Sequence, residues 1–111
     1  MVERFKQRML DQLSVLQSDV NQDRLEQECV WYAQKIDIAE ELQRLEAHRA
    51  ECQRIVSAGG VMGRQLDFLL QELNRETNTI SSKSVAIPVT QAALEIKLLL
   101  EQMREQVQNI E

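Results

Sequence analysis

Apolar residues recur at helical spacing along nearly the whole chain. The first stripe contains Val2, Phe5, Met9, Leu13, Leu16 and Val20. It predicts an amphipathic helix that ends between Ser18 and Asn21. A second helix is predicted from Asn21 or Gln22, and its stripe contains Leu25, Cys29, Ala33 and Ile36. Asp37 and Glu40 then have the spacing of a capping box, so we expect a new or kinked helix to begin at Asp37.

The rest of the chain contains three further helical stripes. They are Ile38, Leu42, Leu45, Cys52 and Val56, then Leu66, Leu69, Leu70, Leu73, Thr77 and Ile80, and finally Val89, Ala92, Ala93, Ile96, Leu99, Leu100, Met103, Val107 and Ile110. The glycine-rich segment Ser57–Gly63 predicts a chain reversal. Ser81–Pro88 is expected to be either a polar connector or a phosphate-binding loop. Leu94 and Leu98 lie off the last stripe, so they are either incidental exposed leucines or part of a second contact. We expect the second, with a neighbouring subunit or another domain covering them and Phe68.

The composition favours helices and offers little to strands. The chain has 111 residues, with three glycines, one proline and only two Phe, one Trp and one Tyr. Leu, Glu, Gln, Arg and Ala are abundant, and these residue types have high helix propensity. The sequence therefore predicts a single all-α domain over residues 1–111, folded as a bundle of four to five amphipathic helices without a sheet.

The charge of the chain limits what it can bind by itself. The formal net charge is −5 at pH 7, and strong non-specific nucleic-acid binding requires an excess of Lys and Arg. If RNA is the ligand, another segment must supply most of the attraction. The sequence contains no apolar run of about 20 residues and begins without a signal-peptide pattern, so we expect a cytoplasmic protein that does not enter a membrane. Cys29 and Cys52 are expected to be free thiols.

Polar side chains border two of the apolar stripes. Asp67, Gln71, Asn74 and Asn78 follow one flank of the Leu66–Ile80 stripe, and Glu72, Glu76, Thr79 and Lys83 follow the other. Phe68 and Arg75 point away from the leucines. Glu41, Arg44 and His48 share one edge of the preceding helix. Such a set can bind a metal ion and a polyanion together, whereas the simpler interpretation is a solvated helix face.

Four blocks of the sequence resemble one family. They are RLEQE (Arg24–Glu28), DIAEELQRLEAH (Asp37–His48), GRQLDFLLQELNRETNTISSKS (Gly63–Ser84) and REQVQNIE (Arg104–Glu111). Together they are similar to the C-terminal part of the bacterial YicC/YloC endoribonucleases. Family members have an additional N-terminal domain to which nothing here corresponds, so the chain resembles the isolated C-terminal domain. Ala86–Val89 and the glycine-rich turn depart from the family pattern.

The resemblance implies a metal-dependent endoribonuclease that uses manganese or magnesium and forms a ring-like homo-oligomer around RNA. In such an enzyme His48 is the expected general acid or base, helped by Glu41, Arg44 and Arg75. The expected metal ligands are Asp67 and Glu72. The expected RNA-binding residues are Asn78, Lys83, Arg104, Gln108 and Asn109.

Two questions stay open at this point. Asp67 and Glu72 project from well-separated sides of one helix, so either only one of them binds the metal or two subunits build the site. The alternative function is a helical oligomerisation module whose catalytic groups belong to the missing domain. Convergence of Glu41 and His48 with Asp67 or Arg104 on one pocket would favour the enzyme, and dispersal over the surface would favour the module.

Overall fold

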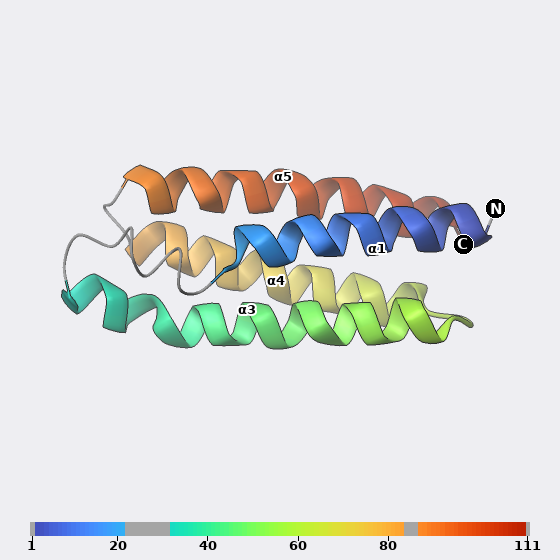
Figure 1. Ribbon diagram of the computed structural model, residues 1–111, viewed down its shortest axis with the longest axis horizontal. Coiled ribbons are helices and arrows are strands. Elements are labelled where there is room, and N and C mark those ends of the chain that lie inside the picture. The colour runs from blue at the N-terminus through green and yellow to red at the C-terminus, as the bar shows by residue number, and fades with distance from the viewer. Residues whose placement is uncertain (1, 22–31, 84–86, 111) are drawn as a thin grey trace.

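The chain forms a bundle of long antiparallel helices. The computed structural model describes residues 2–21, 32–83 and 87–110, and the side chains of residues 32–37 are not described. The described helices are α1 (Val2–Asp19), α3 (Tyr32–Ala58), α4 (Gly63–Lys83) and α5 (Ile87–Ile110). They run up and down along a body of 46 × 19 × 19 Å (Figure 1). The all-α prediction is confirmed, with four helices and no strand in the described ranges.

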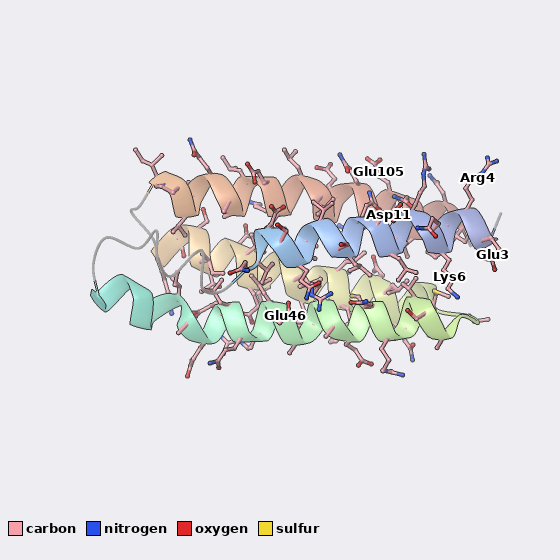
Figure 2. All side chains as sticks on the ribbon, in the orientation of Figure 1. Glu3, Arg4, Lys6, Asp11, Glu46 and Glu105 are labelled. Carbon is pink, nitrogen blue, oxygen red and sulfur yellow. The ribbon has the colours of Figure 1, made fainter. Side chains whose placement is uncertain are left out.

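Each helix packs against two neighbours around a shared core. In the described part of the chain, α1 contacts α3 and α5, and α4 also contacts α3 and α5. Described members of four of the predicted stripes line the interior, where Met9, Leu42, Leu66, Leu73 and Met103 are fully buried. Burying one such side chain stabilises the fold by about 1.5–3 kcal/mol. Charged side chains such as those of Glu3, Arg4 and Glu105 project from the outside of the bundle (Figure 2).

The reversal between α3 and α4 lies where the glycines predicted it. Gly59 and Gly60 have φ angles of +78° and +87°, a region that side chains with a Cβ rarely adopt. The Gly59 N–H donates a hydrogen bond to the Ile55 carbonyl, with an N···O distance of 3.2 Å, and so closes the end of α3. A short turn of this kind makes α3 and α4 antiparallel neighbours.

Two predicted boundaries were wrong. Helix α3 passes through Asp37 without a break, so this residue does not cap a new helix. Helix α4 continues through Ser81 and Ser82 to Lys83, and the Ser82 hydroxyl donates a hydrogen bond to the Thr79 carbonyl at 3.0 Å. Ser81–Pro88 is therefore mostly helical, with α5 beginning at Ile87, and residues 84–86 lie outside the described ranges. The stripe predicted from Leu25 to Ile36 also lies outside the described side chains.

One core position of α3 holds a charged residue that the stripe omitted. Arg49 lies between Leu45 and Cys52 at helical spacing, so it occupies a position in the apolar stripe, and it is 4% exposed. Its guanidinium donates to both carboxylate oxygens of Glu46, at 2.8 and 2.7 Å, and to Oε1 of Gln53 at 2.7 Å. The burial of Arg49 is therefore compensated by partners on its own helix. The hydrogen bond from Arg49 to Glu46 also raises the pKa of Arg49.

Candidate functional site

Two ion pairs connect α3 with α4. Arg44 Nε lies 2.9 Å from Oε1 of Glu76, and Lys83 Nζ lies 2.8 Å from Oε1 of Glu41. Because the helices are antiparallel, residue numbers rise on one helix as they fall on the other. The two pairs therefore follow one another along one side of the α3/α4 contact. We call this row of charged residues the α3/α4 ladder, and its first members are Glu41, Arg44, Glu76 and Lys83.

Glu41 is the most enclosed group of the α3/α4 ladder. It is 3% exposed, and its Oε2 atom is buried without a hydrogen-bond partner among the described residues. Burial raises the pKa of Glu41, but the hydrogen bond from Lys83 and the nearby charges of Lys83 and Arg44 outweigh it, so the net shift of the pKa is downward from 4.5. Glu41 is therefore ionised at neutral pH and holds Lys83 in place.

Arg44 joins three carboxylates. Besides Glu76, its guanidinium lies 3.4 Å from Glu41 and 3.6 Å from Glu40. The hydrogen bond to Glu76 raises the pKa of Arg44, which keeps it charged at any physiological pH. With 46% of its side chain exposed, Arg44 still presents part of its guanidinium to solvent and to an approaching anion.

By helical spacing, His48 and Glu72 occupy the next rung of the α3/α4 ladder. One turn from Arg44 along α3 is His48, and one turn from Glu76 in the opposite direction along α4 is Glu72. Both residues are half-buried at this edge. Arg75 adds a cation beside them, with its Nη1 atom 3.8 Å from Oε1 of Glu72 and 75% of its side chain exposed. The structure therefore gathers an imidazole, a carboxylate and guanidinium groups on one face.

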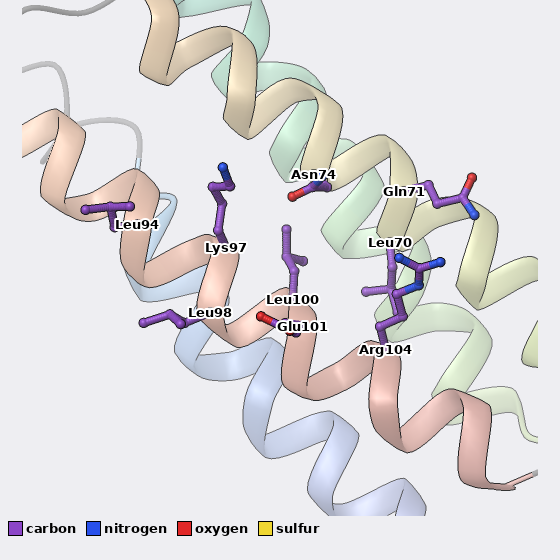
Figure 3. A pocket seen from close by; sticks show the side chains of 9 residues that line it. All are labelled: Leu70, Gln71, Asn74, Leu94, Lys97, Leu98, Leu100, Glu101 and Arg104. Carbon is purple, nitrogen blue, oxygen red and sulfur yellow. The ribbon is translucent and has the colours of Figure 1, made fainter.

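Asp67 and Arg104 lie on the other side of α4. Arg104 Nε is 3.5 Å from Oδ1 of Asp67, and Gln71 donates to Oδ2 of Asp67 at 3.1 Å. These contacts border a groove of about 460 Å³ between α4 and α5 (Figure 3). The groove is lined by Leu70, Gln71, Asn74, Leu94, Lys97, Leu98, Leu100, Glu101 and Arg104. Figure 3 shows Leu94 and Leu98 along the α5 side of the groove, where they are 56% and 62% exposed.

A second hollow continues from this groove along the exposed face of α4. It shares Gln71 and Asn74 with the groove and is also lined by Arg75, Asn78, Thr79 and Ser82. We call the two hollows together the amide groove, since amide side chains line both. Its lining contains Arg75, Lys97 and Arg104 but only one carboxylate, Glu101. The lining itself therefore carries more cations than carboxylates, and two of these cations, Arg75 and Arg104, pair with Glu72 and Asp67 next to it.

The remaining RNA-binding predictions fall elsewhere. Gln108 is exposed near the end of α5, and Asn109 borders a small hollow between α1 and α5 together with Arg4 and Arg8. Lys83 belongs to the α3/α4 ladder instead of a loop. Of the predicted RNA-binding residues, Asn78 and Arg104 share the amide groove.

The predicted site residues thus occupy two faces of α4 instead of one concave pocket. Glu41, Arg44, His48 and Glu72 follow the α3/α4 ladder, while Asp67 and Arg104 follow the α4/α5 contact. Within the described ranges, no group of three or more His, Cys, Asp or Glu side chains is arranged to hold a metal ion. Among the described residues, Asp67 and Glu72 lie on different polar edges, with Asp67 beside Arg104 and Glu72 beside Arg75.

Sequence reasoning missed the part played by Glu76. Glu76 is 9% exposed and bonded to Arg44, yet it was placed only on a polar flank of its helix. Part of the signal was available in the spacing, because Glu72 and Glu76 are four residues apart, as are Arg44 and His48. Recognising it required the register of α3 against α4, which the turn between them sets.

Comparison with known proteins places the chain in a family. A family model described as "Endoribonuclease YicC-like, C-terminal" matches residues 1–111. The probable endoribonuclease YicC of Haemophilus influenzae is 49% identical over 106 residues, which cover 96% of this chain and 37% of that protein. The probable endoribonuclease YicC of Clostridioides difficile is 42% identical over 113 residues, which cover 99% of this chain and 39% of that protein.

The chain therefore spans less than two-fifths of the length of these relatives. In the part of the chain that the structure describes, no helix has the length and apolar character needed to cross a membrane. The match over all 111 residues shows that the chain belongs to the YicC-like endoribonuclease family and corresponds to its C-terminal domain.

Proposed function

We propose that this chain works within a longer endoribonuclease and carries groups that cleave RNA phosphodiester bonds. Both relatives are called probable endoribonucleases, which supports RNA as the substrate. The observation that carries the proposal is the rung formed by His48 and Glu72 beside the Arg44–Glu76 pair. Proton transfer, a carboxylate and phosphate-binding guanidinium groups are what phosphodiester cleavage requires in one place.

Each group of the α3/α4 ladder has a distinct role in this proposal. His48 accepts a proton from the attacking hydroxyl or donates one to the departing oxygen, roles that histidine fills most often in enzymes. Arg44 and Arg75 bind the phosphate, and their exposed guanidinium groups can reach it. Glu41 and Glu76 are positioning residues, because they hold Lys83 and Arg44 at fixed places.

Manganese or magnesium dependence forms part of the proposal. One chain does not provide a complete ligand set among its described residues, so Glu72 or Asp67 would contribute a single ligand to a shared site. The other ligands would come from a second subunit of a ring-like homo-oligomer or from another part of the longer protein. This arrangement agrees with the placement of the two carboxylates on opposite sides of α4.

The amide groove is the proposed path for the RNA strand. Asn74, Asn78 and Gln71 offer donors and acceptors to sugars and base edges, while Arg75 and Arg104 offer charge to phosphates. Because Arg75 lines the groove and also pairs with Glu72, the groove and the α3/α4 ladder meet at this residue.

The proposal is tested by substituting His48, Asp67 and Glu72 one at a time by alanine in the full-length protein. Cleavage of a structured RNA is measured with and without manganese, and oligomer size is checked by light scattering. We expect His48→Ala to reduce turnover about 100-fold or more with assembly unchanged. Glu105→Ala, on the exposed face of α5, is the matched carboxylate control and should cleave like the wild type.

Wild-type turnover in all three variants would refute the assignment of the chemistry to this domain. Loss of turnover in Glu72→Ala that is partly restored by a higher manganese concentration would support a metal ligand at Glu72. If Asp67→Ala behaves in the same way, two subunits build the site. If only one variant responds to manganese, only that carboxylate binds the ion.

A helical oligomerisation module is the second candidate function. The distribution of the polar residues over two faces of α4 favours it, as does the exposure of Leu94 and Leu98 on the outside of α5. Exposed leucines one turn apart form an apolar strip that association would cover. In this case Leu94→Glu combined with Leu98→Glu should lower the oligomer size, while the single alanine variants of the first experiment should cleave normally.

A further inference from the structure

Phe68 is an exposed aromatic residue that the proposed function has not used. Its side chain is 60% exposed on α4, on the opposite side of the helix from the buried Leu66 and Leu73. Phe68 precedes Glu72 by one helical turn, about 5.4 Å along the axis. It therefore extends the α3/α4 ladder beyond the rung of His48 and Glu72.

A pocket of about 440 Å³ opens beside Phe68, between α3 and α4. It is lined by Glu51, Ile55, Arg64, Gln65, Phe68 and Leu69. Ile55 and Leu69 are each 8% exposed and provide an apolar base for the pocket, while Phe68 forms an aromatic wall. On α3, His48, Glu51 and Ile55 lie at helical spacing on one face, so the pocket is continuous with the α3/α4 ladder.

The chemistry of the pocket fits a flat, partly polar ligand. An aromatic wall over an apolar base stacks well with a planar ring, and the Gln65 amide can donate and accept hydrogen bonds at the ring edge. Arg64 is exposed at the rim and adds positive charge. The one carboxylate, Glu51, is bonded to the guanidinium of Arg54, which offsets its negative charge. An unpaired nucleobase meets all of these conditions.

We propose that Phe68 stacks on an unpaired base of the RNA next to the cleaved phosphate. The inference rests on the proposed function and adds a base-binding subsite to it. A base stacked on Phe68 lies about one helical turn from Glu72. The phosphate of that nucleotide can therefore reach the rung of His48 and Glu72. Because a base must leave its helix to enter the pocket, the subsite selects single-stranded RNA over a duplex.

The first test measures binding of a short fluorescein-labelled single-stranded RNA to the full-length protein in the presence of a metal chelator. Phe68→Ala should weaken this binding about tenfold, and Phe68→Trp should retain it. Binding of the same RNA annealed to its complement should change less than twofold, since a paired base cannot stack. Val15→Ala removes an exposed apolar side chain from α1, which does not contact α4 in the described residues, and should bind like the wild type.

The second test uses Phe68→Trp as a reporter, with wild-type protein to correct for Trp31. The fluorescence of the new indole should be quenched by the single-stranded RNA. A series of RNAs, each with one abasic sugar, should include one member that fails to quench. Quenching that is equal for every member, or absent for all, would overturn the base-binding subsite.

Three further outcomes separate this proposal from association of two copies through Phe68 and from the proposed cleavage function. If Phe68→Ala binds RNA like the wild type but changes the oligomer size, a second copy of the chain covers Phe68 and the subsite is refuted. If Phe68→Ala binds normally while His48→Ala abolishes cleavage, the subsite is refuted and the proposed function stands. If the wild-type protein cleaves no RNA yet Phe68→Trp shows the abasic response, the subsite stands and the cleavage function fails.

Discussion

Lys83 Nζ lies 2.8 Å from Oε1 of Glu41, although the two residues are 42 positions apart in the chain. One is the last residue of α4, and the other lies in the first half of α3. The pair therefore ties the end of α4 to α3 on the same side as Arg44 and Glu76. Since the spacing of the α3/α4 ladder depends on this register, the ion pair connects the stability of the fold with the geometry of the candidate site.

Removing the cation of this pair should destabilise the bundle. In Lys83→Met, the Glu41 carboxylate stays buried with one partner fewer, and its Oε2 atom already lacks a hydrogen bond among the described residues. We expect the free energy of unfolding to fall by about 1–2 kcal/mol, as measured by urea denaturation. Lys97→Met, which removes a half-buried lysine from α5, should change it by less than about 0.5 kcal/mol. Equal effects of the two substitutions would show that the pair does not stabilise the fold.

The same carboxylate should make stability depend on acid pH. The pKa of Glu41 in the folded protein is lower than its ordinary value of 4.5, so folding favours the ionised form. Its contribution to stability is then fully present above about pH 4.5 and is lost as the pH falls through the lower, folded-state pKa. In Glu41→Gln this part of the pH dependence should disappear.

The measurement is the free energy of unfolding of wild type and Glu41→Gln at a series of pH values from neutral to about 3. The difference between the two proteins should shrink as the pH falls. Glu105→Gln, on the exposed face of α5, serves as the control and should follow the wild type at every pH. A constant difference between wild type and Glu41→Gln would contradict the lowered pKa.

The helical period was sufficient to predict the bundle, because apolar residues at these spacings can be buried together only by packing helices against one another. The stripe Leu66–Ile80 is buried as predicted, and Phe68 is exposed as predicted. Asp37 shows the limit of local motifs. A capping box stabilises a helix start, but the spacing does not exclude a helix that simply continues, and α3 does so.

The candidate site was harder to predict than the fold, since it depends on which residues of different helices meet. The sequence placed Glu41, Arg44 and His48 on one edge and Glu72 on another, and these predictions agree with the described helices. Pairing them required the register between α3 and α4. Periodicity within one helix gives no information on that register, which the length and geometry of the turn determine.

Removing the buried charge of Arg49 and removing its partner Glu46 should have different effects on stability. Replacing it by methionine puts an apolar side chain of similar length at a core position of α3, so Arg49→Met should leave the stability unchanged or raise it. Glu46→Ala instead leaves the guanidinium buried with only Gln53 as a described side-chain partner. We expect Glu46→Ala to lower the free energy of unfolding by about 2–3 kcal/mol.

Urea denaturation of both variants and of the double variant measures the coupling between the two residues. In a protein that already carries Arg49→Met, Glu46→Ala should lower the free energy of unfolding only slightly, because no buried charge then remains to be paired. If Arg49→Met is the more damaging of the two single substitutions, the guanidinium is a net stabiliser of the core and the prediction is wrong.

Arg75 and Asn78 should affect RNA binding in different ways, although both line the amide groove. Arg75 carries an exposed charge, so Arg75→Ala should weaken binding of single-stranded RNA uniformly across sequences. It should also reduce the slope of log K against log salt concentration by about 0.7, the value for one phosphate contact on a single strand. Asn78 is uncharged, so Asn78→Ala should weaken binding without changing this slope.

Fluorescence anisotropy titrations of the full-length protein at several salt concentrations distinguish the two effects, with a metal chelator present to prevent cleavage. Lys6→Met removes one positive charge from α1, which contacts α3 and α5 but not α4 in the described residues, and should leave both affinity and slope near the wild type. If Lys6→Met lowers the slope as much as Arg75→Ala, the charge of the whole protein attracts RNA and the amide groove has no special part in binding. If Asn78→Ala lowers the slope, its amide acts by holding a cation in place, and the assigned contact to a sugar or base is wrong.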